Sequence, residues 1–140
     1  MNERLVWADD GTKPILDSIY EVYSNLGPGL LESVYERALV YELTSRGLSV
    51  RSQVPIRAFY KGKDLQMDFR LDILVNDSIV VELKSVEQLN PVHEKQLLTY
   101  LKLADKKLGL LVNFNESYLK RGIKRVVNGF EEPPVELKNN

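Results

Sequence analysis

The chain has 140 residues, with 19 Lys and Arg against 20 Asp and Glu, and it contains no cysteine. This length suits one domain, which needs no disulfide or structural metal to stay folded. The composition excludes a disulfide scaffold, a zinc–thiolate site and a cysteine nucleophile, and the single His93 excludes any site that needs two histidines.

The sequence favours a cytoplasmic protein with no membrane partner. No stretch approaches the roughly 18 consecutive apolar residues of a membrane helix. The first ten residues carry acids and lack the apolar run of a secretory signal. The net charge of −1 disfavours a protein that coats nucleic acid non-specifically, although it permits a local basic groove.

The folded domain is predicted to span residues 14–130, between a polar N-terminal segment, 1–13, and a polar tail, 131–140. The chain shows no internal repeat and no low-complexity segment. These boundaries leave one domain of ordinary size to carry the function.

Two helices are predicted at the start of this domain. The first begins at Pro14, a residue favoured at the first helical position, and ends at Gly27-Pro28-Gly29. The second runs from about Leu30 to Arg46, where Gly47 is a natural C-terminal stop. Helical spacing predicts that one face of the second helix carries Leu31, Val34, Ala38 and Tyr41.

The rest of the domain is predicted to be mostly strands. Asn90 as cap and Pro91 at the first position open a third helix, which runs to about Ala104. Alternating or continuous apolar residues predict strands over 48–60, 65–75, 79–84, 108–114 and 123–127. A turn is predicted at 61–64. The order ααβββαββ indicates an α/β sandwich with a mixed sheet.

The segment 70–84 predicts a hairpin that places three charged residues together. If Asn76-Asp77-Ser78 forms its loop, Asp72 faces Glu82, and Lys84 follows two residues further along the same face. A two-residue loop would mix these charges with the apolar side, so the three-residue loop is favoured. The opposite face is then predicted to be wholly apolar, with Leu71, Ile73, Val75, Ile79, Val81 and Leu83.

Two carboxylates and a lysine at adjoining strand positions suit a divalent cation. Mg²⁺ takes one or two carboxylates and completes its shell with water and substrate oxygens. Lys84 could then orient an attacking water or offset developing negative charge. The alternative, a solvated strand face with an ion pair, stays open on spacing alone, because such pairs are common and weak.

The pattern D-x(9)-E-L-K, formed by Asp72, Glu82 and Lys84, resembles the PD-(D/E)XK nuclease motif, with Leu71 in place of the motif's proline. The run from Gly29 to Tyr35 reads G-x-x-E-x-x-Y and resembles the GxxExxY family, a branch of that superfamily. The likeness continues through the VVELKSV strand, the HEKQLLTYL helix and the NF…GIKRVVN end, and so covers nearly all of the predicted domain.

This resemblance implies a restriction-endonuclease-like α/β/α sandwich with a central mixed β-sheet, and hydrolysis of phosphodiester bonds with Mg²⁺ or Mn²⁺. It implies Asp72, Glu82 and the backbone carbonyl of Leu83 as metal ligands, with Lys84 assisting the water. Glu32 would complete the acidic shell. Without the resemblance, Glu32 simply suits the positive end of a helix dipole. Cleavage would leave a 5′-phosphate and a 3′-hydroxyl.

Further site residues are expected on the third helix and the last strand. Gln96 and Tyr100 read Q-x-x-x-Y, which resembles a motif of exonuclease-type members in which the glutamine lies beside the metal site. Tyr100 and His93 are expected to bind substrate, although a capping role for His93 stays open. Lys124 and Arg125 are candidates for phosphate contacts, and their strand sends them to opposite faces.

Two other functions remain open. The fold could serve as a catalytically weak or inactive nucleic-acid-binding or protein-interaction module, or the charges could be only a surface network. For a nuclease, DNA is favoured over RNA as the partner. A homodimer fits the resemblance as well, because a nuclease of this size often needs a second subunit to cut two strands.

Overall fold

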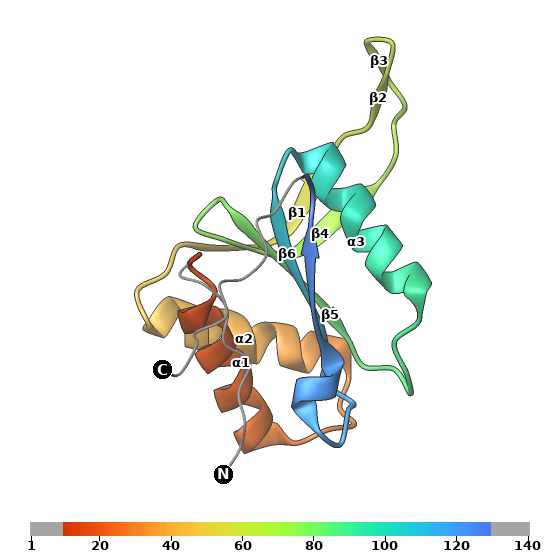
Figure 1. Cartoon of the computed structure of the whole chain (residues 1–140). Coiled ribbons are helices and arrows are strands. Elements are labelled where there is room, and N and C mark those ends of the chain that lie inside the picture. Colours follow the sequence, from red (N-terminus) through yellow and green to blue (C-terminus); the bar gives the residue numbers. More distant parts are fainter. Residues whose placement is uncertain (1–9, 130–140) are drawn as a thin grey trace, which may run out of the picture.

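The computed structural model describes residues 10–129, which form a mixed five-stranded sheet with helices on both faces (Figure 1). The predicted tail and most of the predicted N-terminal segment lie outside the described residues. The elements are α1 (Lys13–Leu26), α2 (Glu32–Ser45), β1 (Val50–Ile56), β2 (Phe59–Tyr60), β3 (Lys63–Asp64), β4 (Phe69–Val75), β5 (Ile79–Lys84), α3 (Pro91–Ala104), β6 (Leu108–Asn113), the 3₁₀ helix Leu119–Gly122 and β7 (Ile123–Val127).

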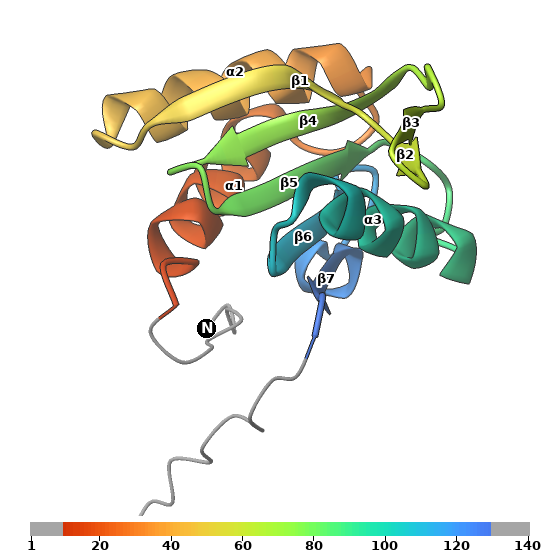
Figure 2. The same ribbon diagram turned by 90° about the horizontal axis from the view of Figure 1, so that it is seen from above.

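The sheet has the order β1-β4-β5-β6-β7, and it is mixed because β5 and β6 run parallel while the other neighbours run antiparallel. Helices α1 and α2 cover one face and α3 covers the other (Figure 2). The predicted α/β/α sandwich is therefore confirmed. Within the described part of the chain, no helix has the length and apolarity required to cross a membrane.

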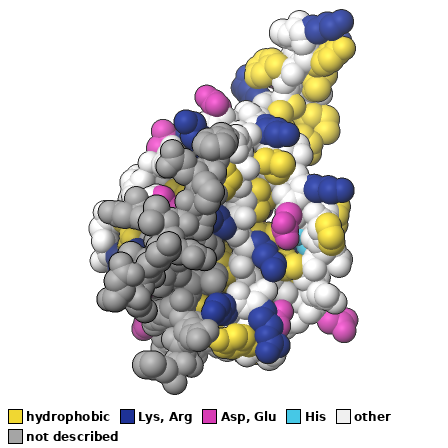
Figure 3. All heavy atoms as spheres, in the orientation of Figure 1, with side chains coloured by type: hydrophobic (Ala, Val, Ile, Leu, Met, Phe, Trp, Pro, Cys, Tyr) yellow, Lys and Arg dark blue, Asp and Glu magenta, His cyan; other side chains and the backbone are white. Residues whose placement is uncertain are grey.

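A small hairpin, β2–β3, projects from the body of the molecule (Figures 1 and 3). The backbone N–H of Leu65 donates to the carbonyl of Ala58 and closes its base. The strands predicted over 48–60 and 65–75 are thus too long, because the chain leaves the sheet between Ile56 and Phe69. Periodicity alone did not show that residues 57–68 lie outside the sheet, because this segment also contains residues typical of strands.

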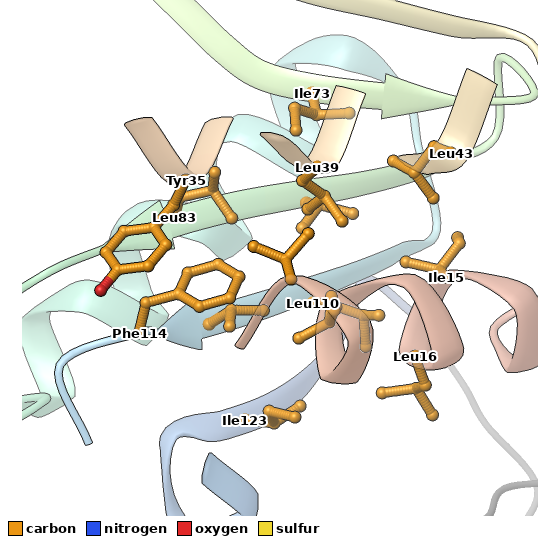
Figure 4. Close-up of a cluster of buried hydrophobic side chains, with 14 of the residues drawn as sticks. Ile15, Leu16, Tyr35, Leu39, Leu43, Ile73, Leu83, Leu110, Phe114 and Ile123 are labelled. Atoms are coloured by element: carbon orange, nitrogen blue, oxygen red, sulfur yellow. The ribbon is translucent and has the colours of Figure 1, made fainter. Parts of the chain in front are cut away.

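The buried face of α2 is not the predicted one. Leu31, Val34 and Tyr41 are exposed, whereas Tyr35, Leu39 and Leu43 are buried. Apolar residues occur on more than one side of this helix, so helical spacing did not identify the face that packs. The ring of Tyr35 stacks on that of Phe114, with centroids 4.4 Å apart, and this contact fixes the rotation of the helix (Figure 4).

The β4–β5 hairpin has the predicted three-residue loop and register, because Val75 pairs with Ile79 and Ile73 pairs with Val81. The prediction of one wholly apolar face is wrong at Leu71, which lies in the core under α3 together with Leu74 and Val80. The face assigned to the charges is therefore also buried for most of its length. The charged residues occupy only the end of it.

The changed direction of Leu71 coincides with an interruption in the pairing of β4 with β1. The pairing of β1 with β4 skips Gln53, the residue opposite Asp72, and Gln53 has a left-handed backbone with φ of 51°. The register is the same on both sides of this row, so neither strand contains an inserted residue. The interruption lies in the row of the candidate carboxylates.

Candidate functional site

Asp72 on β4 and Glu82 on β5 are joined where the regular pairing of the two strands ends. The backbone N–H of Asp72 donates to Oε1 of Glu82 at 2.9 Å, and the backbone N–H of Leu83 donates to Oδ2 of Asp72 at 2.9 Å. Beyond Ile73 and Val81, the last regular pair of β4 and β5, carboxylate oxygens thus accept the hydrogen bonds of these backbone N–H groups in place of backbone carbonyls. The bonds hold the two carboxyl groups side by side, as the sequence predicts.

Glu82 is buried, and its surroundings disfavour a negative charge. Burial raises the pKa of its carboxyl to about 8, and the negative charge of Asp72 acts in the same direction. Lys84 acts in the opposite direction and favours the carboxylate. Two adjacent carboxylates repel each other in this buried environment, and a bound divalent cation would offset that repulsion.

The pKa of Glu82 predicts how stability depends on pH when no metal is present. The folded state holds the proton more tightly than the unfolded chain, so this stabilisation is complete below about pH 4.5 and is lost as pH rises through about 8. We expect the melting temperature in EDTA to fall over this window, and to fall less in Glu82→Gln. Parallel melting profiles for the two proteins, measured by circular dichroism, would contradict the assignment.

The donor set fits a hard divalent cation. Asp72 and Glu82 each accept one backbone hydrogen bond, and their carboxyl groups also contact each other, so their oxygens are gathered at one place. Mg²⁺ needs only one or two carboxylates in addition to water and substrate oxygens. Among the described residues, no three acidic or histidine side chains are gathered tightly enough to form a metal-ligand cluster by themselves. A two-carboxylate site is therefore the arrangement that the side chains support.

Helix α2 adds acidic groups to a small cavity beside Asp72. The cavity measures about 150 Å³ and is lined by Glu32, Ser33, Glu36, Gln53, Asp72 and Leu83. Its place beside the carboxylate of Asp72 agrees with the expected position of Glu32. Glu36 was not among the predicted site residues, and its pKa is raised mainly by burial and also by the charges of Asp72 and Glu32. Its signal was the i, i+4 spacing to Glu32, which puts both acids on one helix face.

The G-x-x-E-x-x-Y residues organise the start of α2. The hydroxyl of Tyr35 donates to the carbonyl of Gly27 at 2.5 Å and accepts from the backbone N–H of Leu30 at 3.0 Å. Gly29 has a φ of 95°, which favours glycine at this turn. Ser85, next to Lys84, donates to the carbonyl of Leu30. The loop before Glu32 is thus tied both to its own helix and to the end of β5.

Asn113 fixes the chain that leaves the site after Lys84. Its side chain donates to the carbonyl of Val86 at 2.9 Å and accepts from the N–H of Val86 at 3.1 Å. Asn113 is fully buried. Its backbone carbonyl oxygen would lie 2.6 Å from a Cβ atom at position 122, so the close approach of Gly122 excludes a larger residue there. The sequence analysis missed Asn113 as a positioning residue, although a polar residue at the end of an apolar strand was a detectable signal.

Helix α3 brings Gln96 and Tyr100 together near the carboxylates. Nε2 of Gln96 donates to the hydroxyl of Tyr100 at 3.0 Å. Burial raises the pKa of Tyr100, and the charge of Glu82 raises it further. His93 caps the helix, because its Nδ1 accepts from the N–H of Asn90. Its predicted contact with substrate stays a prediction.

Strand β7 separates the two predicted basic residues. Glu82 on β5 pairs with Leu111 on β6, and Leu111 pairs with Lys124 on β7. The Cα atoms of Glu82 and Lys124 are therefore separated by two strand spacings, roughly 10 Å, and their side chains lie on the same face of the sheet. Arg125 is on the other face and forms an ion pair with Asp10. The structure therefore brings Lys124, and not Arg125, to the side of the sheet on which Glu82 lies.

Comparison with known proteins gives one match. The family model described as the PD-(D/E)XK nuclease superfamily matches residues 9–126. The matched range contains every residue placed at the site above. No curated protein and no solved structure matches the chain.

Proposed function

Because the chain belongs to the PD-(D/E)XK nuclease superfamily, we propose that it is a nuclease that hydrolyses phosphodiester bonds with Mg²⁺ or Mn²⁺. Members of this superfamily generally use divalent metal ions and act on nucleic acid. The observation that carries the proposal is the pair of carboxyl groups of Asp72 and Glu82, locked together by backbone hydrogen bonds beside Lys84.

In this proposal, Asp72, Glu82 and the backbone carbonyl of Leu83 hold the metal. When bound, the metal supplies positive charge that lowers the pKa of a water molecule and offsets charge on the phosphoryl group. Lys84, two residues from Glu82 on the same strand, orients the attacking water and stabilises the negative charge that develops. The water loses a proton and adds to phosphorus as the bond to the 3′ oxygen breaks, and the 3′ oxygen takes up a proton from solvent, which leaves a 5′-phosphate and a 3′-hydroxyl.

The remaining side chains have supporting roles. Glu32 completes the acidic shell from α2, and Glu36 is positioned by the hydrogen bond that it accepts from Gln53 at 2.6 Å. Gln96 orients groups around the site through its bond to Tyr100. His93 and Lys124 are proposed to contact the substrate at the two sides of this centre. The ion pair of Arg125 with Asp10 leaves the phosphate role to Lys124.

We further assign the chain to the GxxExxY branch. The support is that Gly29 occupies a turn that favours glycine, Tyr35 holds the loop before α2, and Glu32 faces the cavity beside Asp72. DNA is the favoured substrate, and a homodimer is the proposed arrangement if both strands of a duplex are cut.

Metal binding gives a direct test of this site. We expect Mn²⁺ to raise the melting temperature of the wild-type protein, with a stabilisation of about 2.7 kcal/mol at a hundred times the dissociation constant. Asp72→Asn should abolish most of this rise, because it removes a proposed ligand. Titration calorimetry with Mn²⁺ measures the same loss directly.

Asp77→Asn is the matched control, because Asp77 lies in the loop of the same hairpin, is 73% exposed and pairs with Arg51. It should bind Mn²⁺ as the wild type does. Equal binding by wild type and Asp72→Asn would show that the proposed ligand set is wrong.

A further inference from the structure

The β2–β3 hairpin is rooted at the end of the sheet that carries the candidate site. Strand β1 ends at Ile56 and β4 begins at Phe69, and these two residues pair with each other. Continuing the β4–β5 register brings Arg70 level with Lys84. The hairpin therefore extends outward from the row next to Lys84, and not from the opposite end of the sheet.

The hairpin lies within reach of a substrate held at the site. Eight residue steps separate Gln53, which is opposite Asp72, from the hairpin tip at Lys61, so the tip lies at most about 27 Å away. Because that span corresponds to several nucleotides, one strand can contact both places at once.

The hairpin exposes large apolar side chains. Phe59 is 58% exposed and Tyr60 is 62% exposed, and Leu65 and Met67 beside them are about half exposed. Two adjacent exposed aromatic rings on a projecting ribbon are costly in water unless a partner covers them. Aromatic rings of this kind stack on unpaired bases, which all present a flat π face.

Cations are interleaved with these rings. The segment 57–70 carries Arg57, Lys61, Lys63 and Arg70 against Asp64 and Asp68, whereas the whole chain has a net charge of −1. Nζ of Lys61 lies 5.4 Å from the centroid of the Tyr60 ring. Figure 3 shows basic and hydrophobic side chains side by side along the projection. This combination matches a polyanion with exposed bases, whereas the core of a protein–protein interface is depleted of lysine and aspartate.

We propose that the β2–β3 hairpin binds single-stranded nucleic acid next to the cleavage site, with unpaired bases stacked on Phe59 and Tyr60 and phosphates at Lys61 and Lys63. The inference rests on the proposed function, because the strand held by the hairpin is the one that reaches Asp72 and Glu82. It deepens that function by assigning the substrate class: a strand with unpaired bases, either free or beside a duplex.

Binding of labelled oligonucleotides tests the proposal. Fluorescence anisotropy in EDTA compares a 20-nucleotide single strand with the corresponding duplex, so that binding is measured without cleavage. The variant F59A/Y60A should bind the single strand roughly tenfold more weakly or worse, with a smaller loss on the duplex. The variant K61A/K63A should reduce the slope of log affinity against log salt by about 1 to 2.

Matched controls come from elsewhere on the surface. Tyr41→Ala removes a 71% exposed aromatic ring on α2, and K102A/K107A removes two exposed lysines. Both controls should bind the single strand as the wild type does. Circular dichroism spectra that superimpose on the wild type confirm that each variant is folded.

The outcomes separate this inference from the proposed function. Wild-type affinity for the single strand in both hairpin variants overturns the inference, even if the wild type cleaves nucleic acid in Mn²⁺. Equal losses on single strand and duplex overturn the assigned substrate class. Hairpin-dependent binding of single strands by a protein that leaves every strand uncut supports the inference and contradicts the proposed hydrolysis. A dimer that dissociates in F59A/Y60A while nucleic-acid binding is unchanged assigns the hairpin to a second copy and overturns the proposal.

Discussion

Lys84→Ala is expected to lose at least about 10²-fold of the rate at which the wild-type protein cleaves nucleic acid in Mn²⁺. Lys84 lies two residues after Glu82 on β5, and its positive charge lowers the pKa of the Glu82 carboxyl. Its removal leaves the developing negative charge without this partner, while the metal ligands remain. The measurement is a time course on labelled single- and double-stranded DNA and RNA, with the wild type beside the variant.

Lys107→Ala is the control for this experiment, because Lys107 is exposed and precedes β6 at the opposite end of the sheet. It should cleave at the wild-type rate. Cleavage by Lys84→Ala at the same rate as by the wild type would indicate a contaminant or a wrong catalytic assignment. Absence of cleavage by every protein, together with tight binding, would favour the non-catalytic nucleic-acid-binding module.

Tyr35→Ala is expected to lower the free energy of unfolding by roughly 3–5 kcal/mol. The ring is fully buried and lies nearly parallel to that of Phe114, with an interplanar angle of 6°. Truncation leaves a cavity between α2 and the end of β6, and it also leaves the carbonyl of Gly27 and the N–H of Leu30 without their hydroxyl partner. Urea unfolding followed by circular dichroism measures the loss.

Two further variants divide this effect into its parts. Tyr35→Phe keeps the stacked ring and removes only the hydroxyl, so its loss should be about 1–3 kcal/mol. Tyr41→Ala alters an exposed tyrosine of the same helix and should stay within about 0.5 kcal/mol of the wild type. A loss for Tyr35→Ala no larger than that for Tyr41→Ala would show that the ring does not anchor α2.

The sequence predicted those parts of the site that depend on short-range pattern. The loop Asn76-Asp77-Ser78 and the alternation around it determine the register, and the register alone brings Asp72 opposite Glu82. Asn90 as cap and Pro91 at the first position likewise predicted the start of α3. In each case, neighbouring residues in the chain carry enough information to define the geometry.

Features that depend on contacts between distant segments were missed. The packing face of α2 is selected by Phe114, which is far away in sequence. The pairing of β1 with β4 is interrupted at Gln53 and Asp72, and the adjacent Leu71 lies in the core under α3. Asn113 holds Val86 across the end of the sheet. Neither periodicity nor propensity encodes such pairings, because both describe one segment at a time.

The tie between Asn113 and Val86 also bears on how this fold tolerates change. Residues 87–88 are exposed and lie between two fixed points: Val86, which is held through both its N–H and its carbonyl, and Leu89, which packs against the core under α3. A longer connection there need not shift Lys84 or the start of α3, because each is held on its own side of residues 87–88. This short loop is therefore the place where a relative or a designer can graft new recognition sequence beside the site without disturbing its carboxylates.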